Sequence, residues 1–118
     1  MLVAGTRTDM SRRATDRVKQ YHLMGAAITP APDVNGDVTV TAPSATFTST
    51  PIDPDSAPPY TYAWEQQPVA DPTATIGTPN ASSTTFTGLV AGRVYYLRLT
   101  IINAQLTKFV KFMRVFAT

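Results

Sequence analysis

The stretch from Gly88 to Ile101 limits the possible folds of this chain more than any other. It opens with a turn that holds two glycines, Gly88 and Gly92, and continues into a run with apolar residues at alternate positions. Such alternation predicts a β-strand with one buried face. Tyr95 stands just after the turn, at the start of that strand. We therefore expect its ring to be buried between two packed sheets and its hydroxyl to bond backbone a few residues upstream.

The remainder of the chain to its end repeats short strand-like runs, with turn signals between them. Seven runs are predicted as strands: 37–42, 45–49, 60–66, 73–76, 83–87, 94–103 and 108–118. This number and spacing is typical of an all-β sandwich, and ten prolines with few helix-favouring residues support it. The expected core contains Phe47, Trp64, Phe86, Tyr95, Leu97 and Leu99.

Several segments carry a family resemblance. The aromatic run at 58–64, the short run at 74–76 and the segment 83–89, together with the tyrosine turn, resemble immunoglobulin-like modules, especially of the fibronectin type III and PKD kinds. Such modules occur in bacterial surface proteins and in tailed-phage virion proteins. The resemblance covers about residues 37–118 and implies an immunoglobulin-like β-sandwich with Trp64 as its core tryptophan. It is specific for fold and weak for function, because this sandwich hosts unrelated roles.

Residues 1–32 have no counterpart in that resemblance. We predict that they form an N-terminal arm and linker, and that the sandwich domain spans 33–118. Apolar side chains at helical spacing within 10–23 predict a short amphipathic helix, which would be marginal in water by itself. We expect the arm to become ordered against a partner; the alternative is a disordered leader with no role. The arm residues expected to bind the partner are Met10, Arg13, Arg17, Val18, Tyr21 and Leu23.

Charge is unevenly distributed, although the net charge is only +2. Residues 1–22 hold five bases and two acids, residues 23–92 hold six acids and no base, and residues 93–118 hold five bases and no acid. This pattern favours electrostatic complementarity between copies of the chain or with a larger assembly. The alternative is ordinary surface charge that happens to cluster.

The last two predicted strands are apolar on both faces, whereas a sheet with one face in water should alternate apolar with polar residues. Their second face therefore has the composition of an interface, with arginines among apolar side chains. The alternative is that the chain's own arm covers it. The residues expected to bind a partner there are Tyr96, Arg98, Phe112 and Arg114.

No catalytic or metal-binding set is found in the sequence. Cysteine is absent, and His22 is the only histidine. The run 33–37 resembles the opening of a calcium loop, but Val38 and Ser44 stand where that loop needs glycine and glutamate. Asp53 and Asp55 lie in a loop with no apolar enclosure to separate their pKa values. We predict a non-enzymatic protein with no metal and no cofactor.

The sequence also bears on location and on partners. No secretory signal or membrane span is visible, so we expect a protein that is not exported by the general pathway and that has no membrane partner. The basic residues of the arm are interrupted by Asp9 and Asp16, and the sandwich offers no aromatic-basic face, so nucleic acid is not favoured.

The function predicted is structural. We expect a component of a tailed-phage virion, either a capsid decoration or a minor head or tail protein, with other virion proteins or copies of itself as partners. The virion setting follows from the resemblance, and the assembly role follows from the residues. The alternative is a carbohydrate- or cell-surface-binding module, which exposed Tyr60, Tyr62 or Trp64 on a flat face would favour.

Overall fold

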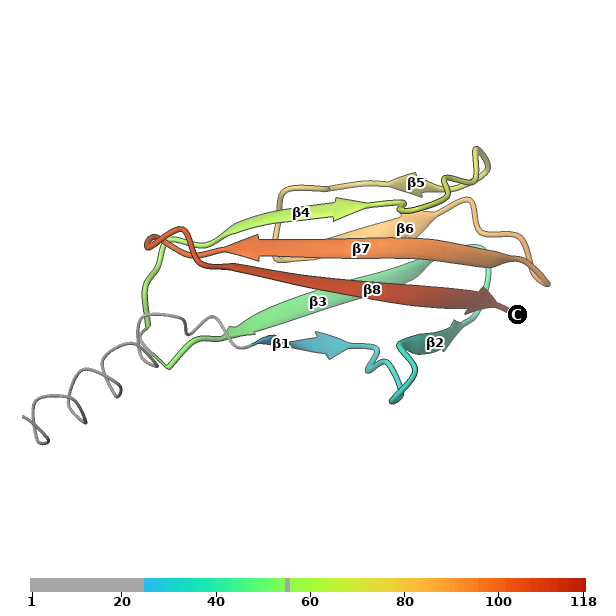
Figure 1. The fold of residues 1–118 in the computed structure, drawn as a ribbon. Coiled ribbons are helices and arrows are strands. Elements are labelled where there is room, and N and C mark those ends of the chain that lie inside the picture. The colour runs from blue at the N-terminus through green and yellow to red at the C-terminus, as the bar shows by residue number, and fades with distance from the viewer. Residues whose placement is uncertain (1–24, 55) are drawn as a thin grey trace, which may run out of the picture.

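The chain folds into two packed β-sheets, in which all strand pairs but one are antiparallel in the described residues (Figure 1). The structure, a computed structural model, describes residues 25–54 and 56–118. Its strands are β1 (Gly25–Thr29), β2 (Asp37–Val40), β3 (Ala45–Ile52), β4 (Thr61–Glu65), β5 (Thr75–Ile76), β6 (Ser83–Thr87), β7 (Val94–Ile102) and β8 (Lys108–Ala117). One sheet has the order β1-β3-β6-β5 and the other β2-β8-β7-β4, which confirms the predicted β-sandwich. The described residues include no helix long and apolar enough to span a bilayer.

Strand β1 corrects the predicted boundary between arm and sandwich. It lies inside the range 1–32 assigned to the arm, yet it pairs along its whole length with β3 and buries Ile28 in the core. The strand escaped the sequence analysis because three of its five residues are glycine or alanine, so the apolar alternation is faint. The predicted helix and the arm residues Met10, Arg13, Arg17, Val18, Tyr21 and Leu23 lie outside the described residues.

The chain changes sheets between β1 and β2. Strand β1 pairs antiparallel with β3, whereas β2 pairs parallel with β8, from Asp37 beside Arg114 to Val40 beside Ala117. The connecting turn is fixed by Asp33, whose Oδ1 accepts hydrogen bonds from the backbone N–H groups of Asn35 at 2.8 Å and Asp37 at 3.0 Å. These bonds favour the charged carboxylate and lower the pKa of Asp33.

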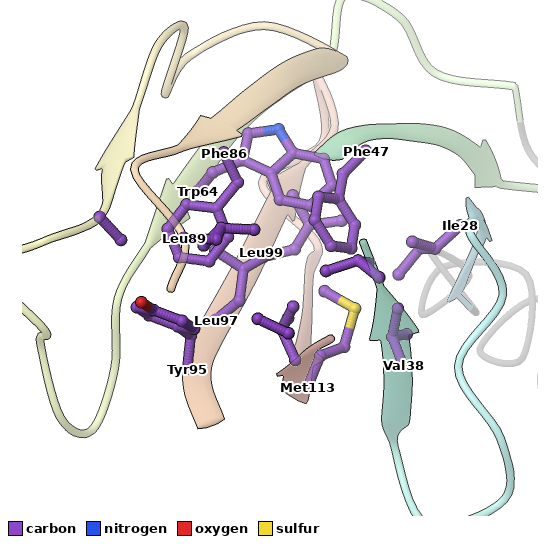
Figure 2. Packing of buried hydrophobic residues seen from close by; sticks show 14 of the residues in the cluster. Ile28, Val38, Phe47, Trp64, Phe86, Leu89, Tyr95, Leu97, Leu99 and Met113 are labelled. Atoms are coloured by element: carbon purple, nitrogen blue, oxygen red, sulfur yellow. The ribbon is translucent and has the colours of Figure 1, made fainter. Parts of the chain in front are cut away.

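The predicted core is confirmed. The six expected residues are all buried, and Trp64 is only 1% exposed. Their rings pack as tilted or edge-on pairs, as aromatic quadrupoles prefer: the Phe86 and Tyr95 centroids lie 5.6 Å apart at 77° (Figure 2). The indole N–H of Trp64 donates to the Ala81 carbonyl at 2.7 Å, which satisfies the one polar atom of that side chain.

The tyrosine turn is also confirmed. The hydroxyl of Tyr95 accepts a hydrogen bond from the backbone N–H of Val90, five residues upstream, at 2.8 Å. It also lies 3.0 Å from the Thr73 hydroxyl, in the segment between β4 and β5. Because the Tyr95 ring is buried between the sheets, one side chain fastens two loops to the core.

Candidate interaction face

The second faces of β7 and β8 turn away from the core, as the alternation predicts. Strand β7 buries its inward residues completely, and its outward residues are half-buried or exposed. We call seven of these outward side chains, on the neighbouring parts of the two strands, the interaction face; its members are Val94, Tyr96, Arg98, Val110, Phe112, Arg114 and Phe116. Phe112, at its centre, is 54% exposed. This face therefore places aromatic and aliphatic surface in solvent beside two guanidinium groups.

The strand register brings the four predicted residues of this face together. Tyr96 lies directly opposite Arg114, and Arg98 lies directly opposite Phe112. Directly opposed side chains on one face of an antiparallel pair have Cβ atoms about 5 Å apart. The four residues thus form one compact block of two aromatic rings and two cations.

Arg114 is held in place from two sides. Its Nε and Nη2 donate to the two carboxylate oxygens of Asp37 at 2.7 and 2.9 Å, across the parallel β2–β8 pair. Its guanidinium carbon also lies 5.8 Å from the ring centroid of Phe116. The hydrogen bonds to Asp37, followed by its charge, raise the pKa of Arg114, so the group remains a cation.

Arg98 is oriented by Glu65, which lies on the neighbouring strand β4. Its Nη2 donates to Glu65 Oε1 at 2.7 Å, in register with the β4–β7 pairing. Its Nε is buried and has no hydrogen-bond partner within residues 25–54 and 56–118. A buried donor without a partner costs stability.

A hollow of about 210 Å³ opens beside the block. Three of the four predicted residues line it, namely Tyr96, Phe112 and Arg114. The other walls come from two loops, through Asn35 and Gly36 before β2 and through Gln67 and Pro68 after β4. The Gln67 N–H donates to the Tyr96 carbonyl at 3.2 Å, which ties the second loop to β7. The face is therefore not flat, because its centre carries a concavity with aromatic and amide groups.

The sequence analysis missed the residues that support this block. Asp37 and Glu65 orient the two arginines, and Asn35 and Gln67 line the hollow. No local pattern could have identified them, because their position depends on β2 pairing with β8 and on β4 pairing with β7. The one available signal was charge, since both acids belong to the acidic middle of the chain and both arginines to its basic end.

The aromatic platform considered for carbohydrate does not exist in the predicted form. Trp64 is part of the core, and Tyr62 is half-buried against it. Tyr60 is half-buried, and its hydroxyl donates to Asp53 Oδ2 at 3.1 Å. Desolvation, and then this bond to a carboxylate, raise the pKa of Tyr60. These three rings do not form an exposed stacking surface.

The acidic residues considered for calcium or catalysis are used in local structure. Asp33 accepts backbone hydrogen bonds, and Asp37 is paired with Arg114. Asp53 accepts from the Ala57 N–H and the Tyr60 hydroxyl, each at 3.1 Å. Within the described part of the chain, no three residues of metal-ligand type gather at one point. Asp55 and His22 lie outside the described residues.

Comparison with known proteins gives a consistent result for the fold. A protein-family profile described as K319L-like, PKD domain matches residues 35–112. The solution structure of the PKD domain from KIAA 1837 protein matches with a TM-score of 0.59 and 22% identity, over 80% of this chain and 87% of that domain. The sequence matches no curated protein.

A second solved structure comes from a larger protein. It is a nucleoside hydrolase-related hypothetical protein from Saccharophagus degradans, described as associated with carbohydrate metabolism, with a TM-score of 0.61 and 14% identity. The match covers 79% of this chain but only 25% of that protein, so this chain spans about a quarter of its length. At such identity the likeness establishes the fold alone.

Proposed function

This chain belongs to the K319L-like PKD domain family, and from that premise we propose that it is a non-enzymatic structural protein of a large assembly. It attaches through the interaction face of β7 and β8. The setting we propose is a tailed-phage virion, as a capsid decoration or a minor head or tail component. The partners are then other virion proteins, including copies of the chain itself, and the location is the virion.

The observation that carries the proposal is the block of Tyr96, Arg98, Phe112 and Arg114. Aromatic residues and arginine are the types enriched in protein interfaces, and they carry most of the binding energy there. Both arginines are already oriented by carboxylates, so less side-chain freedom is lost when a partner docks.

The predicted arm forms the second part of this proposal. Its expected contacts are Met10, Arg13, Arg17, Val18, Tyr21 and Leu23, with apolar and basic side chains meeting apolar and acidic groups of a neighbouring subunit. Two separate attachment points joined by a short chain bind more strongly than either one, because binding of the first raises the effective concentration of the second.

The test is incorporation into particles. Phe112→Asp places a carboxylate at the centre of the interaction face, and Thr85→Asp places one on the exposed outer face of the opposite sheet. Each variant is expressed with the structural proteins encoded in the same genome, and particles are separated by sedimentation. We expect Phe112→Asp to reduce incorporation by about tenfold or more, and Thr85→Asp to leave it unchanged. Equal incorporation of both variants would contradict attachment through this face.

The hollow favours one second candidate, a carbohydrate-binding module. Phe112 and Tyr96 could stack on a sugar ring, while the amides of Asn35 and Gln67 could bond its hydroxyls. Titration of the folded protein with simple sugars, followed by amide chemical shifts, tests this candidate. Saturable shifts at Gln67 that vanish in Phe112→Ser would support it; shifts spread over the whole surface would not.

A further inference from the structure

Strand β8 has an edge that its neighbour covers only in part. On one side, β8 pairs with β7 from Lys108 to Phe116. On the other side, β2 begins to pair only at Arg114 and continues to the end of β8 (Figure 1). The first half of β8, residues 108–113, therefore has no strand beside it on that side in the described part of the chain.

The backbone of this half-strand points its hydrogen-bonding groups toward the open side. The Ala117 N–H donates to Arg93 on the β7 side, whereas the Arg114 N–H donates to Gly36 on the β2 side. The N–H and C=O groups of successive residues point to opposite sides of a strand. Those of the even-numbered residues of β8 therefore point to the β2 side. Lys108, Val110 and Phe112 thus turn their N–H and C=O groups to the open edge, although Gly36 lies close to the Phe112 carbonyl.

An apolar cleft of about 530 Å³ lies directly beside this edge, where the two sheets separate. Its walls are Gly25, Ala26 and Ile28 from β1, Ile52 from β3, and Phe109 and Lys111 from β8. Gly25 and Ala26 are small, and a side chain at Gly25 would come into van der Waals contact with the ring of Phe109. An unpaired strand edge beside an apolar cleft is the arrangement into which an extended peptide can add as a further strand.

The charge of the cleft wall indicates what such a peptide carries. Lys111 is half-buried on the inward side of β8, between Phe109 and the core. None of the ion pairs within residues 25–54 and 56–118 involves it. A cation at the rim of an apolar cleft is stabilised by a carboxylate that arrives with the partner.

We propose that the β1–β8 cleft binds an extended segment of a partner protein, which adds as a strand to the edge of β8 at residues 108–112. The segment carries apolar side chains at alternate positions, directed into the cleft, and an acidic residue beside Lys111. The backbone hydrogen bonds supply affinity, and the apolar and acidic positions supply specificity. This site uses the backbone edge of β8 and its inward side chains rather than the outward side chains of the interaction face, and it goes beyond the function proposed above.

The probe is the synthetic peptide acetyl-Thr-Val-Thr-Glu-Thr-Val-Thr-amide. Its two valines and its central glutamate share one face, and its sequence is the same in both directions, so the test assumes no strand direction. It is titrated into the full chain while amide chemical shifts are recorded. We expect saturable shifts at Val110, Phe112 and Ile28. A second peptide, N-methylated at every residue, keeps the side chains of that face but has no backbone donor to offer in either strand direction, and should not bind.

A charge exchange tests the role of Lys111. We expect a peptide with lysine in place of the glutamate to bind the natural protein about tenfold more weakly. Lys111→Glu should reverse that preference. Because a carboxylate in the cleft could prevent folding, Lys111→Met serves as a second variant, and it should bind both peptides equally. Equal affinity of the natural protein for both peptides would overturn the proposal.

Two further results would overturn it in favour of other occupants. Hydrogen exchange of Val110 and Phe112 is measured on the full chain over a range of protein concentrations. Slow exchange at every concentration would mean that residues of the same chain fill the cleft. Protection that rises with concentration would mean that a second copy fills it. We expect fast exchange at all concentrations, with protection only after peptide is added.

Discussion

The two outer faces of this sandwich differ sharply in composition. On the sheet β1-β3-β6-β5 the outward residues of β3 and β6 are mostly threonine and serine, with cross-strand pairs such as Thr46 with Thr85. On the sheet β2-β8-β7-β4 most of the corresponding positions of β7 and β8 hold valine, tyrosine, phenylalanine or arginine. Both sheets share one core, and both alternate inward and outward side chains.

This difference separates two reasons for a residue to be apolar. Inward apolar residues are required by the fold, because neither sheet can exist without burying them. The fold does not require the outward residues of β7 and β8 to be apolar. The opposite sheet, whose exterior is mostly threonine and serine, shows that this architecture tolerates a polar exterior. The apolar exterior of β7 and β8 is therefore not a requirement of the architecture, which is why the proposed attachment is placed there.

The largest expected effect contrasts an inward with an outward aromatic residue. Trp64→Ala removes a fully buried ring and should lower the free energy of unfolding by about 3–5 kcal/mol, much of the stability of a domain of this size. Phe112→Ala removes an exposed ring and should cost far less. Denaturant unfolding of both variants measures the difference; similar losses would show that the two faces are not distinct in stability.

An intermediate effect is expected for two adjacent tyrosines that face opposite ways. Tyr95→Phe leaves the Val90 N–H without its acceptor and should lower the free energy of unfolding by about 1–3 kcal/mol. Tyr96→Phe removes an outward hydroxyl from the interaction face and should change it by less than about 0.5 kcal/mol. Thermal unfolding of the pair checks this prediction. A larger loss for Tyr96→Phe would reverse the assignment of the two sides of β7.

The smallest expected effect is an exchange of exterior character. Phe112→Thr gives β8 the residue type of the opposite face, and Thr85→Phe does the converse on β6. Each should change the free energy of unfolding by no more than about 0.5 kcal/mol. Solubility should rise in the first variant and fall in the second, as measured by light scattering against concentration. A marked loss of stability in Phe112→Thr would show that this ring supports the fold.

Local patterns were enough to predict most of the fold. The glycine turn and Tyr95 are neighbours in sequence, so the hydrogen bond to Val90 could be foreseen. The apolar alternation of 94–103 and 108–118 likewise predicted which side chains face outward. Strand β1 was missed because glycine and alanine give little hydrophobic signal, although its pairing with β3 is complete.

The features that depend on pairing across the chain could not be predicted in this way. The ion pair between Asp37 and Arg114 joins residues 77 positions apart, and it requires β2 to lie parallel to β8. The cleft beside Lys111 exists because β2 pairs only with the second half of β8, from Arg114 onward. Neither the length of that pairing nor the place where the sheets separate is encoded in a short segment.

The parallel pairing of β2 with β8 has a mechanical consequence. If the chain is pulled apart between Gly25 and Thr118, the force on β2 and the force on β8 act along the strands in opposite directions. The backbone bonds from Asp37–Arg114 to Val40–Ala117 are then loaded in shear, all at once, rather than opened one by one as in a zipper. The bidentate contact of Arg114 with Asp37 spans the same pair and shares the load. Such a force is opposed by the whole β2–β8 pairing rather than by one hydrogen bond at a time.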